Sequence, residues 1–439
     1  MIPKPTRSLI LFMLVLTLVT VMSFAQAADQ TPPPVTVVRA GHVLDVRTGK
    51  LAENQAIFIQ GGKITNILPA ATYKLPAGST VIDLPNATLL PGLIDAHTHL
   101  TGDPTDFGYS GLGISVPRSA LIGARNAKVT LEAGFTTVRN VGADGYSDVA
   151  LRDAINAGDV PGPRMLVSGP PLGITGGHCD NDLLPYDYHA TADGVADGVE
   201  GVQHKVREVI KYGADLIKFC ATGGVLSKGD DPNAAQYTFE EMKAIVDDAH
   251  RLGRKVAAHA HGAQGVIFAS NAGVDSVEHG HLMNDEAIAT LKKNGTYLVP
   301  TLYLMDWHRE NAAKANLPDF LRKKMEMVSA QGQANIKKAF AAGVKIGFGT
   351  DAAVYPHGLN AHEFAVYVRL GLTPLQAIQT ATINDADLLG WSDKVGTLEP
   401  GRFADIIAVD GNPVDDVTAL QHVKFVMKGG SVVKNDYGK

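Results

Sequence analysis

Two histidines separated by a single residue, His97 and His99, follow an apolar run that begins at Leu89. Alternate side chains of a β-strand point to the same face, so the two imidazoles would lie together on one side. Two neutral imidazoles at this spacing can bind one metal ion. A bare pair of this kind is equally compatible with ordinary surface or core histidines. The question is therefore whether the rest of the chain supplies further ligands.

Other polar side chains stand inside or directly after short apolar runs that read as strands. They are Lys218 in residues 215–220, His259 and His261 in 255–261, His279 after 276–278, and Asp351 after 345–349. Together with the first pair they would place imidazoles, a lysine and a carboxylate at one rim. Imidazoles and a carboxylate suit zinc, and also manganese, cobalt or nickel. The pattern indicates a site for two divalent metal ions.

Lys218 is the unusual member of this set because an ammonium group cannot bind a metal. Burial lowers the pKa of a lysine and makes its amine available as a nucleophile. Reaction with CO2 would convert it into a carbamate, an anionic ligand with two oxygens that can bridge two metals. A lysine paired with a carboxylate, or one that forms a Schiff base, is the alternative.

The fold class follows from the alternation of strand-like and helical segments after residue 88. Eight strands are expected at 89–97, 136–141, 165–168, 215–220, 255–261, 276–278, 297–301 and 345–349. Helices are expected between them at 118–133, 147–157, 196–212, 239–252, 263–272, 285–293 and 318–342, and after them at 361–370 and 374–389. Eight such repeats predict a parallel (β/α)8 TIM barrel, whose active site lies at the C-terminal ends of the strands.

Both ends of the chain carry shorter strand-like runs with Gly, Asn and Pro turns. The first set, at 35–38, 42–46, 56–60, 64–68 and 80–84, reads as an antiparallel unit that ends near Pro85. Runs at 405–409, 423–427 and 431–433 could rejoin it and complete a small β-sandwich domain. We expect the domain boundaries to be 28–88 and 391–439 for the β domain and 89–390 for the barrel.

The N-terminus has the features of a secretory signal peptide. Lys4 and Arg7 precede an apolar stretch at 9–22, which is short for a membrane span, and Ala25-Gln26-Ala27 offers small residues at a cleavage site. We expect cleavage after Ala27, a periplasmic or secreted protein, and no stable membrane anchor after cleavage. An uncleaved anchor is the alternative.

Composition excludes some classes of partner and leaves one covalent question open. The formal net charge is −6, and the chain has no block of Lys or Arg that would follow a phosphate backbone, so nucleic acid is not an expected partner. Two cysteines, Cys179 and Cys220, do not make a disulfide framework. A single bridge between them stays open.

The combined motifs resemble the amidohydrolase superfamily in its binuclear form. They are the stretches 90–100, 133–142 (AGFTTVRNVG), 256–262 (VAAHAHG), 276–280 (SVEHG), 349–352 (GTDA) and 396–409. The similarity covers nearly everything after the signal. It is greatest to the prolidase-like and imidazolonepropionase-like branch, which includes dipeptidases and ochratoxin-hydrolysing amidases.

The resemblance implies a role for each member of the set. His97 and His99 would hold the more buried metal with Asp351, carbamylated Lys218 would bridge two ions, most simply zinc, and His259 and His279 would hold the second. Asp351 would act as general base toward a hydroxide between the metals and then protonate the leaving amine. His261 would stand next to the site without binding metal.

Substrate contacts are expected from the loops. In the resembled branch a Gly-Gly-His segment supplies an imidazole that contacts substrate, which makes His178 the candidate for binding the scissile carbonyl or the substrate carboxylate; Cys179 departs from the small residue expected next. Tyr237, Arg139 and His357 are further candidates for substrate binding. A water-facing His178, a packing role for Tyr237, and ion-pair or surface roles for Arg139 and His357 are the alternatives.

These observations predict a metal-dependent hydrolase that cleaves the amide bond of a small dipeptide or N-acyl amino acid. An enzyme acting on a cyclic amide, similar to imidazolonepropionase, is the first alternative, and a non-catalytic metal-binding barrel is the second. The presence of Lys218 and the lack of a Glu close after His259 favour the amidase. Similar enzymes are often homo-oligomers, including octamers. The insertion at 303–338 would cap the site, form a subunit contact or be a solvated excursion.

Overall fold

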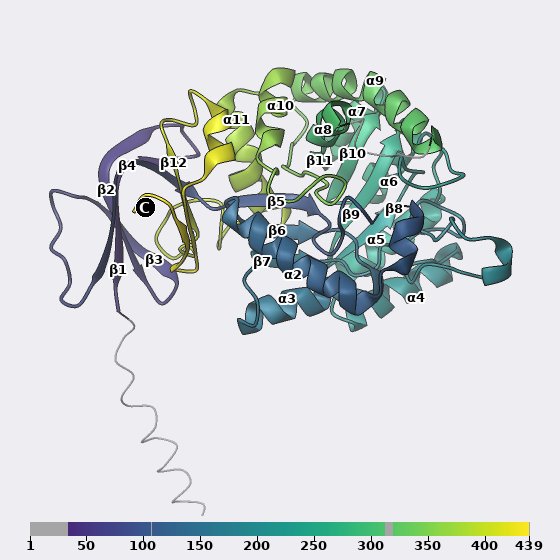
Figure 1. Cartoon of the computed structure of the whole chain (residues 1–439). Coiled ribbons are helices and arrows are strands. Elements are labelled where there is room, and N and C mark those ends of the chain that lie inside the picture. Colours follow the sequence, from purple (N-terminus) through teal and green to yellow (C-terminus); the bar gives the residue numbers. More distant parts are fainter. Residues whose placement is uncertain (1–33, 107, 312–318, 439) are drawn as a thin grey trace, which may run out of the picture.

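The structure is a computed structural model that describes residues 34–106, 108–311 and 319–438. The predicted signal peptide, residues 1–27, lies outside the described residues. Within the described ranges, none of the helices combines the length and the apolar character that crossing a membrane requires. Figure 1 shows two regions, a β-sheet region built from the first and last described strands and a larger region of strands and helices.

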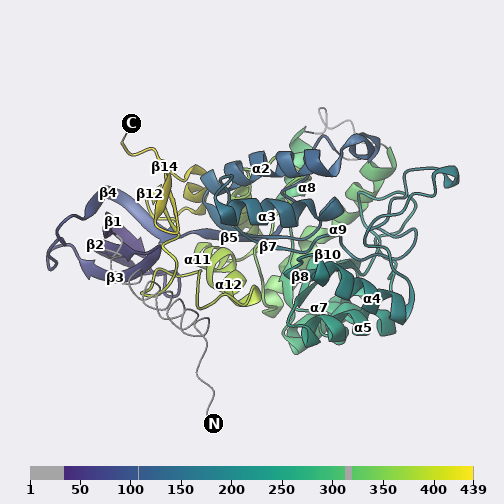
Figure 2. The same ribbon diagram turned by 90° about the horizontal axis from the view of Figure 1, so that it is seen from below.

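Strands from both ends of the chain form one seven-stranded sheet in the order β14-β13-β12-β4-β1-β2-β3. The strands are β1 (Thr36–Leu44), β2 (Leu51–Gln60), β3 (Lys63–Pro69), β4 (Thr80–Pro91), β12 (Ile406–Asp410), β13 (Phe425–Lys428) and β14 (Ser431–Asn435). The expected reunion of the two ends is thus present, because β12 pairs antiparallel with β4. Figure 2 shows the C-terminal strands beside the N-terminal ones from a second direction.

Two details of this sheet differ from the expected antiparallel unit. β1 pairs in parallel with β4, although β1–β2 and β2–β3 are antiparallel. β4 also continues through Pro85 to Pro91, because Leu89 and Leu90 pair with β12 instead of entering the next strand. The backbone of residues 62–64 bonds to that of 402–404, so the sheet folds over an apolar core that includes Val38, Ile57 and Ile406.

The larger region contains two parallel sheets. The first has the order β5-β6-β7, made of β5 (Leu93–Thr98), β6 (Phe135–Asn140) and β7 (Arg164–Val167). The second has the order β11-β10-β9-β8, made of β8 (Leu216–Cys220), β9 (Lys255–Gly262), β10 (Ser276–Leu282) and β11 (Tyr297–Val299). The first strand therefore begins at Leu93, four residues later than expected.

Backbone hydrogen bonds join the two parallel sheets at both edges. On one side, the segment after β7 contacts β8, where Leu172 N–H donates to the Lys218 carbonyl at 2.8 Å. On the other side, residues 345–351 lie between β11 and β5, and Ala96 N–H donates to the Phe348 carbonyl at 2.8 Å. Of the expected strand at 345–349, only one isolated bridge is present, between Ile346 and Leu298. This arrangement is an α/β fold that brings the start and end of the region together.

Helices alternate with these strands and cover their outer side (Figures 1 and 2). They are α2 (Val116–Glu132), α3 (Ser147–Ala157), α4 (Gly198–Lys211), α5 (Phe239–Arg251), α6 (Ala263–Ala272), α7 (Asp285–Asn294), α8 (Tyr303–Asn311), α9 (Asp319–Ala342), α10 (His362–Leu370), α11 (Pro374–Gln379) and α12 (Asp385–Leu388). Apolar faces of α4 and α5, such as Val206 and Ile245, share one buried core with Phe219 of β8. Gly273, directly after α6, has φ of +102°, the left-handed geometry that glycine adopts without steric cost.

Candidate active site

A cavity of about 620 Å³ opens where β5, β8, β9 and β10 end. All six predicted metal ligands line it: His97, His99, Lys218, His259, His279 and Asp351. The volume lies in the range of small-molecule sites. Side chains from α8 and α9, among them Met305 and Met325, line the cavity too, so these described parts of the 303–338 insertion cap the site.

His97, His99 and Asp351 converge on one point. Oδ1 of Asp351 lies 3.4 Å from Nε2 of His97 and 3.3 Å from Nε2 of His99. Ligand atoms of these three residues lie within 4.8 Å of one another. The convergence links β5 to the segment after residue 349, more than 250 positions further along the chain.

The hydrogen bonds on the outer side of each ring fix which nitrogen carries the proton. Nδ1 of His97 donates to the carboxylate of Glu278 at 2.8 Å, and Nδ1 of His99 donates to the Gly142 carbonyl at 3.2 Å. In the neutral rings, both Nε2 atoms are then lone-pair acceptors that face a carboxylate oxygen. Three acceptors facing one another repel unless a cation lies between them, and a Lewis-acidic metal fits this donor set.

Lys218, His259 and His279 line the same cavity and come from the neighbouring strands β8, β9 and β10. The ring of His279 lies 4.8 Å from that of His97 and 4.7 Å from that of His259, centroid to centroid. Nε2 of His259 donates to the Gly223 carbonyl at 3.2 Å, which leaves Nδ1 as its free lone pair. The outer contact of His279 is the Thr301 hydroxyl, 2.7 Å from Nδ1.

Lys218 is buried and has no ion pair or hydrogen bond from its amine within the described part of the chain. Burial lowers the pKa of this amine to about 8, and Arg139 adds to the effect, while Glu278 and Asp351 oppose it. The alternative of a lysine in direct contact with a carboxylate is therefore not what the structure has. A neutral amine is accessible near physiological pH, as reaction with CO2 requires.

Arg139 does not line the cavity, so its position gives no support to the expected substrate contact. Its guanidinium, on β6, donates to the Ser276 hydroxyl at 2.9 Å and to Glu278 at 2.8 Å. Both Arg139 and Glu278 are buried. The buried charge of Arg139 is neutralised by Glu278 of β10. Glu278 in turn accepts a hydrogen bond from the His97 ring and so holds that ring in place.

Three residues of the site hold backbone conformations that non-glycine residues rarely adopt. The φ angles of His279, Thr301 and Asp351 are +72°, +45° and +58°. Asp351 is held by its N–H, which donates to the His97 carbonyl at 2.8 Å. Backbone strain of this kind clusters at functional sites, where surrounding contacts maintain it.

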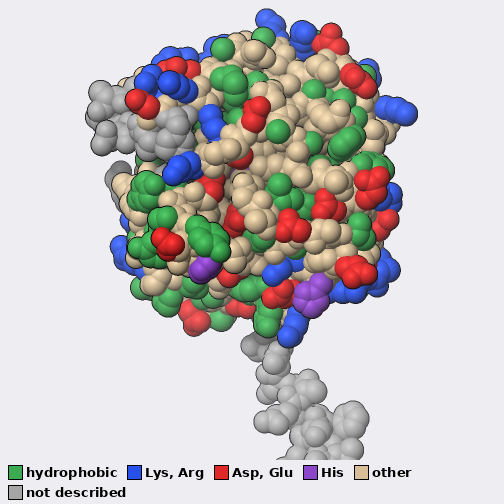
Figure 3. Space-filling model, turned by 90° about the vertical axis from the view of Figure 1, so that its right-hand side faces the viewer, with side chains coloured by type: hydrophobic (Ala, Val, Ile, Leu, Met, Phe, Trp, Pro, Cys, Tyr) green, Lys and Arg blue, Asp and Glu red, His purple; other side chains and the backbone are tan. Residues whose placement is uncertain are grey.

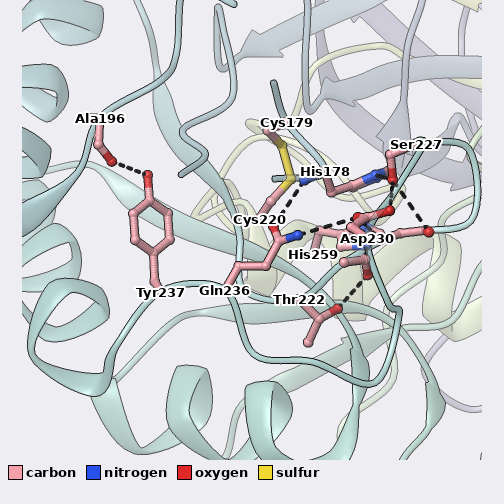
Figure 4. Close-up of a disulfide and its surroundings, with 12 residues drawn as sticks. His178, Cys179, Ala196, Cys220, Thr222, Ser227, Asp230, Gln236, Tyr237 and His259 are labelled. Atoms are coloured by element: carbon pink, nitrogen blue, oxygen red, sulfur yellow. Dashed lines mark hydrogen bonds between the residues drawn. A yellow bond between two sulfur atoms is a disulfide. The ribbon is translucent and has the colours of Figure 1, made fainter. Parts of the chain in front are cut away.

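The loop after β7 carries His178, and a disulfide tethers it. Cys179 is bonded to Cys220 at the end of β8, with 6.1 Å between their Cα atoms, which settles the question that the sequence left open. His178 lines the cavity, its ring 4.2 Å from that of His259. Figure 4 shows His178 beside the disulfide, with Nδ1 directed at Ser227. The cavity position agrees with a substrate contact.

Tyr237 and His357 do not line the cavity, so their positions give no support to the expected substrate contacts. Tyr237 is buried in the apolar core, and its hydroxyl donates to the Ala196 carbonyl at 3.0 Å, pointing away from the site in Figure 4. His357 is buried, with Nδ1 3.4 Å from the Thr130 hydroxyl. Both side chains have structural roles.

Several residues that shape the site had no assigned role from the sequence. They are Glu278, Thr301, Ser227, Asp230, Lys324 and His281. Glu278 carried a signal, since it is a charged residue in the apolar run of β10, like Lys218 in β8. Lys324 carried none, because α9 is rich in exposed lysines.

Parallel strands end in a group of histidines, a buried lysine and an aspartate, a donor set that suits metal ions. The amidohydrolase family model matches residues 88–433, and the chain belongs to the amidohydrolase family. Family membership makes it a hydrolase that acts on amide bonds.

Comparisons with individual proteins support this family assignment. The chain is similar to ochratoxinase of Aspergillus niger, at 36% identity over 371 residues that cover 79% of this chain and 75% of that protein. A crystal structure of a Xaa-Pro dipeptidase with bound methionine in the active site superposes with a TM-score of 0.85 at 38% identity, covering 91% of this chain and 100% of that one. A prolidase complexed with N-methylphosphonate-L-proline gives a TM-score of 0.83 at 32% identity, over 91% of this chain and 100% of that one.

Proposed function

We propose that this protein is a metal-dependent amidase that cleaves the C–N bond of a dipeptide or an N-acyl amino acid. The observation that carries the proposal is the convergence of Nε2 of His97, Nε2 of His99 and Oδ1 of Asp351, all lone-pair acceptors, on one point of the cavity. The similarity to a Xaa-Pro dipeptidase and to ochratoxinase supports a small amide substrate such as a dipeptide.

The architecture in this proposal is a (β/α)8 barrel with a β-sandwich domain from both chain ends. β5 to β11 supply seven of the strands, and residues 345–349 take the eighth place between β11 and β5. The barrel would span residues 89–390, flanked by 28–88 and 391–439. Closure of the barrel explains how Asp351 reaches the β5 histidines.

The residues fit two divalent metals, with zinc the simplest match. His97, His99 and Asp351 would hold one, His259 and His279 the other, and Lys218 would serve both after reaction of its amine with CO2 to a carbamate, with release of one proton. Divalent metals bound here would supply Lewis acidity and lower the pKa of a water molecule. The other tasks of the proposed reaction, which are proton transfer and substrate binding, are carried out by side chains of this protein.

Asp351 is the residue placed to move protons. Its second carboxylate oxygen remains available when Oδ1 faces the histidines, and its side chain is only 15% exposed. In the proposed reaction it takes the proton of the attacking water and delivers it to the leaving amine nitrogen. His178, on the opposite wall beside His259, contacts the substrate.

Charge in the cavity restricts the substrate further. Its lining includes Asp103, Asp106, Asp144, Asp180, Asp182 and Asp193, whereas Lys218 is the one Lys or Arg that lines it among the described residues. The face toward which β5 points is shown in Figure 3, where acidic side chains lie across the central part. A negative mouth disfavours an acidic substrate side chain and favours neutral or basic ones.

Location and assembly are part of the same proposal. Cleavage after Ala27 would release the enzyme to the periplasm or the exterior without a membrane anchor. A homo-oligomer, with an octamer among the possible states, is expected from the resemblance to similar enzymes. Size-exclusion chromatography with light scattering on the mature chain measures the assembly directly.

The experiment that tests the function is a substrate screen read by amine release. It compares N-acyl amino acids with Xaa-Pro, Xaa-Arg, Xaa-Phe and Xaa-Asp dipeptides, using the His97→Ala variant as the blank. We expect metal-dependent hydrolysis within this set and the weakest activity on Xaa-Asp. Hydrolysis of cyclic amides alone would favour the imidazolonepropionase-like alternative, and no hydrolysis with metals bound would contradict an enzymatic role.

A further inference from the structure

Helix α9 turns one face toward the cavity. Met325, Val328 and Ser329 line the cavity, and Gly332 follows them one turn later. A spacing of three and four residues places these positions on the same side of a helix. At Gly332 an added Cβ would lie 3.1 Å from Cβ of His281, so the missing side chain lets α9 approach the end of β10 closely.

Two side chains anchor α9 on either side of this face. The side-chain amide of Asn335 donates to the His281 carbonyl at 2.9 Å, at the end of β10. The ammonium of Lys324 donates to the carbonyls of Gly224 and Ser227, both at 3.0 Å, in the loop after β8. The two anchors are about three helical turns apart. The helix is therefore fixed across the cavity at both ends of the segment that lines it.

An ion pair between Lys324 and Asp230 strengthens the anchor at the β8 loop. The two side chains are only 15% and 6% exposed, so water screens the pair little. The carboxylate of Asp230 also accepts from Gly224 N–H at 2.9 Å and from the Ser227 hydroxyl at 2.7 Å (Figure 4). Hydrogen bonds to a charged acceptor are stronger than neutral ones. Asp230 thus fixes the shape of the loop, and Lys324 fixes the loop against α9.

The elements joined in this way supply an uncharged wall of the cavity. Six apolar side chains of the β8 loop, α8 and α9 line it, and we call them the apolar wall: Val225, Leu226, Leu304, Met305, Met325 and Val328. The six aspartates that line the mouth all come from described segments before residue 194. The cavity therefore has an acidic side and an apolar side, and the apolar side gains free energy by covering an apolar group.

We propose that Lys324 and Asp230 are positioning residues that hold the apolar wall in place, and that this wall receives an apolar side chain of the substrate. The inference rests on the proposed function and narrows its neutral substrates to those with a large apolar side chain. Neither Lys324 nor Asp230 lines the cavity, so both act through their neighbours. Those neighbours are Met325 on α9 and the pair Val225 and Leu226 in the loop.

Amide hydrogen exchange on the metal-loaded protein tests the anchor without turnover. Lys324→Met is expected to raise exchange about 10-fold in residues 224–230 and 325–332, which lose their link, and to leave α3 unchanged. Lys323→Met, at the neighbouring exposed position, is expected to match the wild type in all three segments. Unchanged exchange in Lys324→Met, or an equal rise in α3, would overturn the positioning role.

A series of dipeptides tests the selectivity. In the wild type, we expect the better of Leu-Ala and Ala-Leu to exceed Ala-Ala in kcat/KM by about 10-fold. Lys324→Met should reduce this preference to about 2-fold or less, mainly through a higher KM for the leucine dipeptide. An equal preference in both proteins, or none in the wild type, would overturn the selectivity role. Hydrolysis of none of the three would contradict the proposed function and the selectivity with it, while hydrogen exchange would still decide the positioning role.

Two further variants separate the loss of the anchor from a folding defect. Lys324→Arg keeps a cation beside the same acceptors and is expected to retain the preference for leucine. Lys324→Met combined with Asp230→Asn leaves no unpaired charge in the loop, and we expect it to keep the low preference of Lys324→Met. Recovery of the wild-type preference in this double variant would show that an unpaired charge caused the effect, and would overturn the anchoring role.

The apolar wall itself is tested by a matched pair of substitutions on α9. Met325→Asn is expected to reduce the preference for leucine to about 2-fold or less, because it places a polar group where the apolar side chain would lie. Met327→Asn, at an exposed position two residues further along, is expected to retain the wild-type preference. The same preference in both variants would remove α9 from the apolar wall and overturn the proposal.

Discussion

The carboxylate of Glu278 accepts the Nδ1 proton of His97 at 2.8 Å, on the side of the ring opposite Asp351. Arg139 holds the other oxygen of the same carboxylate at 2.8 Å. Burial alone would raise the pKa of Glu278, but Arg139, His97 and Lys218 outweigh it and hold this pKa at about 2. The charged acceptor fixes His97 with its Nε2 lone pair toward the proposed metal.

Replacing Glu278 with glutamine should weaken metal binding while changing the side-chain volume little. Loss of the charged acceptor makes the His97 ring a poorer ligand, so we expect metal affinity about 10- to 100-fold lower. Competition with a chromophoric chelator measures this affinity. Glu286→Gln, at an exposed position of α7, is the matched control. Equal affinity in Glu278→Gln and the control would show that the carboxylate does not support the site.

Replacing Lys218 with alanine should remove both metal and activity. In the proposed function its carbamate serves both ions, and no carboxylate contacts its amine among the described residues. We expect activity to fall at least about 100-fold, with partial rescue by short carboxylic acids that occupy the carbamate position. Metal content and amine release are measured together. A covalent adduct trapped by borohydride with substrate would instead identify a Schiff-base lysine.

The ligand set could be predicted because each member follows a strand, and polar residues at strand ends converge in a parallel α/β fold. His97, His99 and Asp351 meet where this rule places them. This rule does not predict the positions of the Arg139 and Tyr237 side chains. The direction of each side chain depends on a partner from a distant element: Glu278 of β10 for Arg139, and the Ala196 carbonyl before α4 for Tyr237.

The same reasoning explains which features of the fold the sequence left undetermined. Helices α3 and α6 have the expected bounds because apolar periodicity and a terminal glycine mark them. The division at Pro91 between β4 and β5 depends on pairing with β12, which comes more than 300 residues later. The ion pair of Lys324 and Asp230 joins residues 94 positions apart, so no local sequence pattern predicts it.

The Cys179–Cys220 disulfide should contribute to stability because it closes a loop of 41 residues in the unfolded chain. The double variant Cys179→Ser/Cys220→Ser is expected to lose about 2–4 kcal/mol of unfolding free energy. Urea denaturation measures the loss. A thiol reductant should lower the wild type to the level of the variant and leave the variant unchanged. Equal midpoints of the oxidised wild type and the variant would contradict a stabilising bridge.

Glu363 gives the protein a pH dependence of stability that is separate from the metal site. It is fully buried, and burial raises the pKa of its carboxyl to about 8, reinforced by Asp95 and Asp306 and opposed by backbone N–H groups of Tyr303 and Leu302. Between its unfolded pKa near 4.5 and about 8, the folded state binds a proton that the unfolded state lacks. This contribution to stability is therefore fully present below the unfolded pKa and lost as pH rises toward about 8.

The Glu363→Gln variant should lack this part of the pH dependence. Wild type is expected to lose on the order of 2–4 kcal/mol of unfolding free energy from this group as pH rises between those two pKa values. The loss is measured as the change in denaturation midpoint across that pH range. Glu326→Gln, at an exposed position of α9, is the control. Parallel curves for the wild type and Glu363→Gln would show that Glu363 is not protonated in the folded protein.

Titration of metal-free protein with Zn²⁺ in bicarbonate buffer, read by amine release from the best dipeptide of the screen, tests the two-metal amidase most directly. We expect activity to be absent without metal and to rise until two equivalents per chain are bound. We also expect Asp351→Asn to stay at least about 100-fold less active when it is folded and metal is supplied in excess. Full activity in metal-free protein, or unchanged kcat in metal-loaded Asp351→Asn, would contradict the two-metal amidase.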